Sequence, residues 1–114
     1  MEVPRPTQES KDAFRALVPA APTVTVRAMF ANLAAFVNGN MFMALYGDQV
    51  AFKMDAAALE RAMTRADAET FGPAGRTMRE YVAFPLAAAG LDEWVEASLG
   101  YVATLPPKAP RAPR

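Results

Sequence analysis

The sequence of 114 residues contains no cysteine and no histidine. The lack of thiols excludes disulfides, thiolate metal sites and cysteine nucleophiles, and the lack of imidazole removes the commonest general base and metal ligand. Serine is also scarce, because Ser10 and Ser98 are the only two, and neither lies in a Gly-x-Ser-x-Gly turn. The six glycines form no phosphate-binding motif. We therefore expect no catalytic residues, no metal and no cofactor, and we expect that the protein is not an enzyme.

Long apolar runs are missing as well. Polar residues such as Arg27, Asn32 and Lys53 interrupt the apolar stretches, so none approaches the roughly 20 residues of a membrane helix. The first 14 residues lack the apolar region of a signal peptide. These features predict a cytoplasmic protein with no membrane partner.

What is present is an ordinary globular composition, with 53% hydrophobic and 21% charged residues. A chain of this length has room for one core, so we expect a single domain over residues 1–108 and a flexible Pro/Arg tail at 109–114. Basic and acidic residues balance at twelve each, but three of the basic ones follow residue 107. The body, with nine basic and twelve acidic residues, lacks the basic surplus typical of duplex-binding domains.

Strand and turn signals dominate residues 23–54. The run 23–30 alternates and is rich in β-branched residues, and Asn38-Gly39 and Gly47-Asp48 are strong two-residue hairpin turns. Residues 78–85 alternate again and predict a later strand.

Three helices are expected around these strands. They would begin near Thr7 or Ser10, after Asp55 and at Asp92, each of which is a good N-cap residue. The predicted fold class is α+β: an antiparallel sheet, made of a meander of about four strands plus one or two later strands, with helices packed on one face.

Two-residue turns fix the strand register, so the two faces of the meander can be predicted. One face is wholly apolar and should meet the helices: Ala34, Phe36, Met41, Met43, Leu45, Val50, Phe52 and Met54. The opposite face is mixed: Leu33, Ala35, Val37, Asn40, Phe42, Ala44, Tyr46, Gln49, Ala51 and Lys53.

The mixed face is too apolar for an ordinary solvent face, and it supplies the candidate sites. We predict a partner surface for another protein, or for a second copy in a homodimer, formed by Leu33, Phe42, Tyr46 and Lys53. Candidate anion contacts are Arg27, Arg76 and Arg79. A simpler interpretation of Arg27 and Lys53 is that each charge extends from an apolar strand into water or pairs with a carboxylate.

The segment VRAMFANLAAFVNGNMF resembles the N-terminal domain of the TfoX (Sxy) family of bacterial competence regulators. The matching residues are Arg27, Met29, Phe30, Asn38, Gly39, Met41, Phe42, the Gly47-Asp48 turn, Lys53, Tyr81, Pro85, Trp94 and the closing LPPK at 105–108. Glycines usual in the family are replaced by Ala31, Asn32 and Ala34. The resemblance implies an α+β fold without a known catalytic site and a role in regulation. Full-length regulators of this family look to carry a second, C-terminal helical domain, and the resemblance is to their N-terminal domain.

Three functions stay open from the sequence. The first is a non-enzymatic regulatory or protein-interaction module. The second is a DNA-binding transcriptional regulator that uses its basic residues. The third is a small-molecule-binding domain or minor enzyme that uses Arg79, Glu80 and Tyr81.

Overall fold

The computed structural model describes residues 4–29, 31–72 and 78–108. The expected tail at 109–114 lies outside these residues. The elements follow one another as helix, four strands, helix, two strands and helix. Their bounds are α1 Gln8–Leu17, β1 Val24–Met29, β2 Asn32–Val37, β3 Asn40–Tyr46, β4 Gln49–Lys53, α2 Ala56–Ala62, β5 Glu69–Thr70, β6 Tyr81–Pro85 and α3 Asp92–Val102.

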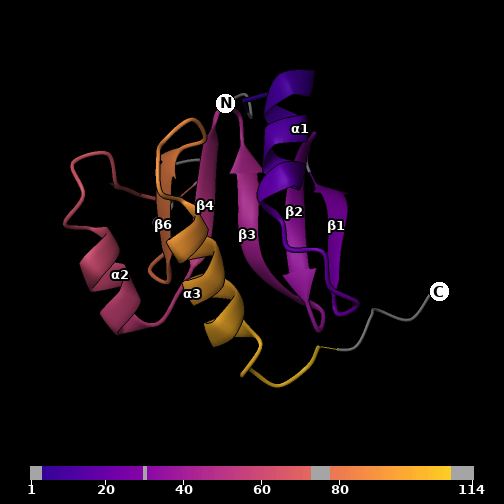
Figure 1. Ribbon diagram of the computed structural model, residues 1–114, viewed down its shortest axis with the longest axis vertical. Coiled ribbons are helices and arrows are strands. Elements are labelled where there is room, and N and C mark those ends of the chain that lie inside the picture. Colours follow the sequence, from indigo (N-terminus) through magenta and orange to yellow (C-terminus); the bar gives the residue numbers. More distant parts are fainter. Residues whose placement is uncertain (1–3, 30, 73–77, 109–114) are drawn as a thin grey trace.

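The strands form one antiparallel sheet in the order β1-β2-β3-β4-β6-β5. Helices α1 and α3 lie across the same face of this sheet, and α2 lies beside β6 (Figure 1). We call the face that meets the helices the inner face and the opposite face the outer face. The predicted α+β class is confirmed, with the four-strand meander in a single sheet.

Two of the three predicted helix caps are present. The side chains of Thr7 and Asp55 accept hydrogen bonds from the backbone N–H groups of Ser10 and Ala58. The prediction for the last helix is wrong by one residue, because Leu91 is its N-cap and Asp92 lies in the first turn. There the carboxylate still favours the positive end of the helix dipole. Within the described residues, no helix has the length and apolar character needed to cross a membrane.

Both predicted hairpin turns form with the predicted local register. Asn38 and Gly39 have φ of 51° and 82°, and Val37 lies opposite Asn40. Tyr46 likewise lies opposite Gln49 across the second turn. Ala31, at the corner between β1 and β2, also has a left-handed φ of 66°. Alanine tolerates this conformation less well than the glycine usual in the resembling family.

A β-bulge changes the two faces from those predicted. Phe36 pairs with Met41 but Ala35 pairs with Met43, so Phe42 is an extra residue in β3. The bulge shifts the register of β2 by one residue relative to β3 and β4. The β2 side chains that were predicted to face outward therefore face inward. No sequence signal marks an inserted residue inside a strand, so the simple alternation from the turn misassigned β2 and the start of β3.

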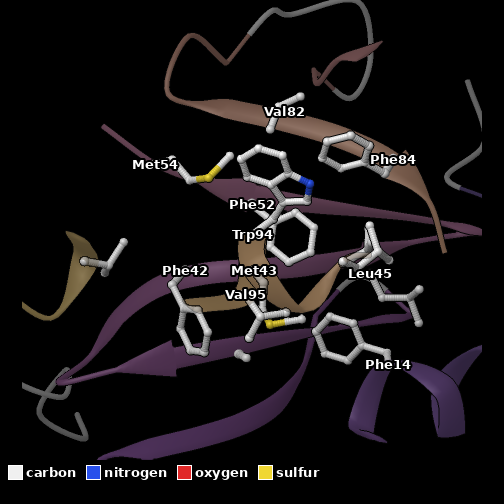
Figure 2. Close-up of a cluster of buried hydrophobic side chains, with 14 of the residues drawn as sticks. Phe14, Phe42, Met43, Leu45, Phe52, Met54, Val82, Phe84, Trp94 and Val95 are labelled. Carbon is white, nitrogen blue, oxygen red and sulfur yellow. The ribbon is translucent and has the colours of Figure 1, made fainter. Parts of the chain in front are cut away.

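The residues on the inner face therefore differ in part from those predicted. Met43, Leu45, Val50, Phe52 and Met54 are buried there as predicted. Leu33, Ala35, Val37 and Phe42 join them, contrary to prediction, while Phe36 and Met41 are half-buried outside this core. Phe14 of α1 and Trp94 and Val95 of α3 close the core from the helix side (Figure 2).

Candidate functional site

The outer face of the sheet is divided into two halves. On the β4 and β6 side, Phe71 packs over Ala51 and Ala83 and forms a second small apolar cluster. Tyr46 and Tyr81 flank the Phe71 ring, with ring centroids 5.7 and 5.9 Å away. This half of the outer face is therefore covered by the chain's own side chains.

The other half carries an open groove of about 300 Å³. Its apolar floor comes from three strands, through Met29 of β1, Phe36 of β2 and Met41 of β3. Its remaining lining residues are Gly39, Asn40, Lys53, Tyr81 and Lys108. The β3 bulge creates this floor, since it leaves Phe36 and Met41 on the outer face and not in the core.

Arg27 borders the groove. Its guanidinium lies 4.0 Å from the centroid of the Phe36 ring, a close cation–π contact that holds the charge above the apolar floor. No carboxylate among the described residues forms an ion pair with Arg27. The stacked guanidinium therefore keeps its N–H groups free for an outside acceptor.

Lys53 is the second cation at the groove, and it is partly neutralised. Its Nζ lies 3.6 Å from a carboxylate oxygen of Glu80. The carboxylate of Glu80, which the third candidate function groups with Arg79 and Tyr81, thus forms its ion pair with β4. Tyr101 of α3 donates its hydroxyl to the same carboxylate at 3.4 Å. Glu80 thus joins the edge of the groove to the last helix.

Tyr81 is another lining residue of the groove. Burial raises the pKa of its hydroxyl to about 12, and the negative charge of Glu80 adds to the increase. The pKa of Tyr101 is raised by the same two causes in the same order, with its hydrogen bond to Glu80 contributing further. Both tyrosines are therefore neutral hydrogen-bonding groups near pH 7, and neither is suited to act as a base.

The C-terminal segment 106–108 supplies the third cation. Lys108 N–H donates to the carbonyl of Asn38 at 2.8 Å, and the Asn40 amide donates to the carbonyl of Pro106 at 3.0 Å. A Cβ on Gly39 would lie 2.0 Å from the Lys108 carbonyl oxygen. The Asn-Gly turn and the Pro-Pro-Lys segment therefore form one structural unit. Asn40 and Pro106, which join them, are 66 residues apart in the sequence.

The predicted partner surface is only partly at the surface. Leu33 and Phe42 are 5% and 0% exposed, so their assignment to an exposed face is wrong, because the bulge turns both inward. Tyr46 is half-buried against Phe71, and Lys53 is half-buried at the groove. Among the candidate anion contacts, Arg27 is exposed beside the groove and Arg79 is exposed, while Arg76 lies outside the described residues.

Sequence reasoning missed Met29, Phe36, Met41 and Lys108 as groove residues. Alternation did place Met29 on the same side of β1 as Arg27, which was a usable signal. Phe36 and Met41 were assigned to the core because the bulge was not foreseen. Lys108 was placed beside the tail, since nothing in a linear sequence shows that it returns to Asn38.

The groove places three apolar side chains, Met29, Phe36 and Met41, next to positive charge. Arg27, Lys53 and Lys108 oppose one carboxylate, Glu80. No group of three or more Asp or Glu side chains with metal-binding geometry occurs among the described residues. Such a surface is chemically suited to hold an apolar side chain with a carboxylate next to it.

Comparison with known proteins adds a family to this geometry. Residues 7–101 match the family described as the TfoX N-terminal domain, which is most of the chain. No match was found among curated proteins or among solved structures. The match spans α1 through nearly all of α3, including both strands that the bulge joins. This chain therefore belongs to the TfoX N-terminal domain family.

Proposed function

We propose that this domain is a non-enzymatic regulatory module that acts by holding another protein at the groove on the outer face of its sheet. The observation that carries the proposal is the groove itself, with its floor of Met29, Phe36 and Met41 under two cationic side chains from different strands. The described helices lie on the inner face or beside β6 (Figure 1), so none of them covers this floor. The regulatory role that the family resemblance implies, and the cytoplasmic location expected from the lack of signal-peptide features, belong to the same proposal.

A protein partner fits better than nucleic acid for two reasons. Only Phe36 and Tyr81 among the described lining residues carry rings, whereas single-stranded nucleic acid is held by a series of stacking rings. The body of the chain also carries nine basic and twelve acidic residues up to position 107. The occupant we propose is an acidic protein segment with at least one large apolar side chain.

The absence of enzymatic activity is likewise a proposal, and it is supported by the residue inventory. The chain has neither histidine nor cysteine. Tyr81 and Tyr101, the polar groups nearest the groove with altered acidity, have raised pKa values and stay protonated near neutral pH. Neither tyrosine is therefore prepared to take a proton from a substrate.

Capture of partners from the native host, compared between two charge reversals, tests the proposal. Lys53→Glu changes the groove, and Arg15→Glu makes the same change on the exposed surface of α1. The wild type and Arg15→Glu should retain the same protein, and Lys53→Glu should retain at least about tenfold less, as expected for a buried charge contact.

Two outcomes would contradict the proposal. One is a partner whose capture is unchanged by Lys53→Glu. The other is tight binding of duplex DNA by the purified chain, with an affinity that falls steeply with salt, which would favour the DNA-binding alternative.

A further inference from the structure

Strand β1 is an edge of the sheet with few of the features that protect edges. Among the residues that the structure describes, only β2 pairs with it; β1 is six residues long and contains neither proline nor a bulge. Natural edges are usually short, bulged, covered or charged, because a free edge invites pairing with another strand. Of these protections β1 has only the charge of Arg27.

The hydrogen-bond pattern shows which backbone groups of β1 face outward. Asn38 N–H donates to the Thr23 carbonyl at 3.3 Å, so residues 23 and 38 form a hydrogen-bonded pair. Backbone direction alternates along a strand, which turns the groups of Arg27 toward β2 and those of Val26 and Ala28 away from the sheet. Val24 also faces away, but its N–H is already bonded to the Ala21 carbonyl at 3.0 Å.

We infer that the partner segment binds β1 as an added strand, with an acidic residue opposite Arg27 and an apolar residue on each side of it. Val26 and Ala28 then form hydrogen-bonded pairs with the apolar residues, and Arg27 occupies the non-hydrogen-bonded position between them, where cross-strand side chains are closest. The flanking apolar side chains lie on the inner face beside Val26, which packs at the margin of the core. This inference rests on the proposed function and specifies how the part of the partner beside the groove is held. The large apolar side chain proposed for the groove floor is then two residues from the acidic one, on the same outer face.

Charge selects an acidic partner over a second copy of this chain. Two β1 strands paired antiparallel about Arg27 would set one guanidinium directly against the other, which is destabilising. The register centred on Val26 would instead oppose Ala28 to Val24, whose N–H is already used. A carboxylate of the partner opposite Arg27 avoids the charge repulsion and does not require the Val24 N–H.

Two synthetic peptides test the inference on the intact protein. Acetyl-STVEVTS-amide carries the acidic residue between two valines, and acetyl-STVKVTS-amide is its matched cationic control. Titration of the ¹⁵N-labelled protein should shift the Val26 and Ala28 amides and slow their hydrogen exchange with the acidic peptide. The lysine peptide should bind at least about threefold more weakly, in line with one cross-strand charge pair.

A modified peptide and a protein variant distinguish strand addition from nonspecific binding. Methylating the two valine nitrogens of the acidic peptide removes its backbone donors and should abolish the shifts at Val26 and Ala28. Arg27→Glu should reverse the preference in favour of the lysine peptide.

The inference is overturned if millimolar acidic peptide leaves Val26 and Ala28 unchanged, if both peptides bind equally, or if the methylated peptide binds as well as its parent. Shifts confined to groove residues such as Met41 and Tyr81 would also overturn it while leaving the proposed function standing. Failure of the proposed function is read separately, from partner capture by Lys53→Glu.

Discussion

Ser98 is a buried polar side chain of α3 that contacts the bulge in β3. Its hydroxyl oxygen lies 2.5 Å from the Phe42 carbonyl and 2.6 Å from the Lys53 carbonyl, and the residue is fully buried. Phe42 has no cross-strand partner at the bulge, so α3 provides the donor that the ladder does not. One serine of only two in the chain therefore joins β3, β4 and the last helix.

Ser98→Ala should lower the free energy of unfolding by about 1–3 kcal/mol, because it removes the single buried O–H that the Phe42 and Lys53 carbonyls share. Urea denaturation followed by Trp94 fluorescence measures the change. Ser10→Ala, at the first turn of α1, is the control and should change stability by less than about 0.5 kcal/mol. A loss at Ser98 no larger than that at Ser10 would contradict the role given to this hydroxyl.

Gly39 serves two purposes at one position. Its φ of 82° suits glycine, and a Cβ there would meet the Lys108 carbonyl oxygen at 2.0 Å. Gly39→Ala should therefore destabilise the protein by about 1–2 kcal/mol for the left-handed backbone alone, and more if segment 106–108 is displaced. Thermal denaturation is the measurement.

Gly100 of α3 gives the opposite control, since nothing lies within 4 Å of its Cβ position. Gly100→Ala should raise stability by up to about 1 kcal/mol through helix propensity. Two Gly→Ala changes of opposite sign are expected, and a common sign would refute the geometric argument.

At the scale of elements, aromatic side chains from β6 and from the segment before it cover part of the outer face. Tyr81 opposes Lys53 across the β4 and β6 pair, and its ring also meets Phe71. The small Ala51 and Ala83 side chains beneath make room for these rings. The groove is the part of the outer face that this aromatic packing leaves uncovered.

The pKa of Tyr81 gives a pH dependence for this packing. Its folded-state pKa of about 12 lies above the ordinary value of 10, so its contribution is complete below pH 10 and is lost as pH rises toward 12. We expect the free energy of unfolding to fall by on the order of 2 kcal/mol across this window. Tyr81→Phe should flatten that part of the profile, and an unchanged profile would contradict the assignment.

At the scale of the whole molecule, the two faces of the sheet have different tasks. The inner face binds three helices through one core, in which Phe84 and Trp94 stack with centroids 6.0 Å apart. The outer face is built from the same strands but carries the groove and ends at the exposed edge of β1. An alternating sequence divides its side chains between these two surfaces.

Arg27 should keep the molecule from pairing with itself at that edge. Arg27→Val would leave a six-residue strand without charge, which is a common route to edge-to-edge association. We expect sedimentation velocity to show concentration-dependent dimers for the variant at tens of micromolar, and less association for the wild type. Arg15→Val, on α1, is the matched control and should behave as the wild type does.

The sequence by itself determined the element order, the α+β class, both two-residue turns and the burial of Met43 and Phe52. These follow from local rules: alternation, cap residues, and an Asn-Gly pair that accepts positive φ. The family resemblance likewise depended on residues close together in the chain.

Only the tertiary structure decided which residues line the groove. The bulge at Phe42 receives a hydrogen bond from Ser98, 56 residues later. Lys108 reaches the groove because its backbone binds Asn38. Both contacts join segments that are distant in sequence, and such contacts leave no periodic signal, so the exposed face of the sheet depended on packing that alternation does not encode.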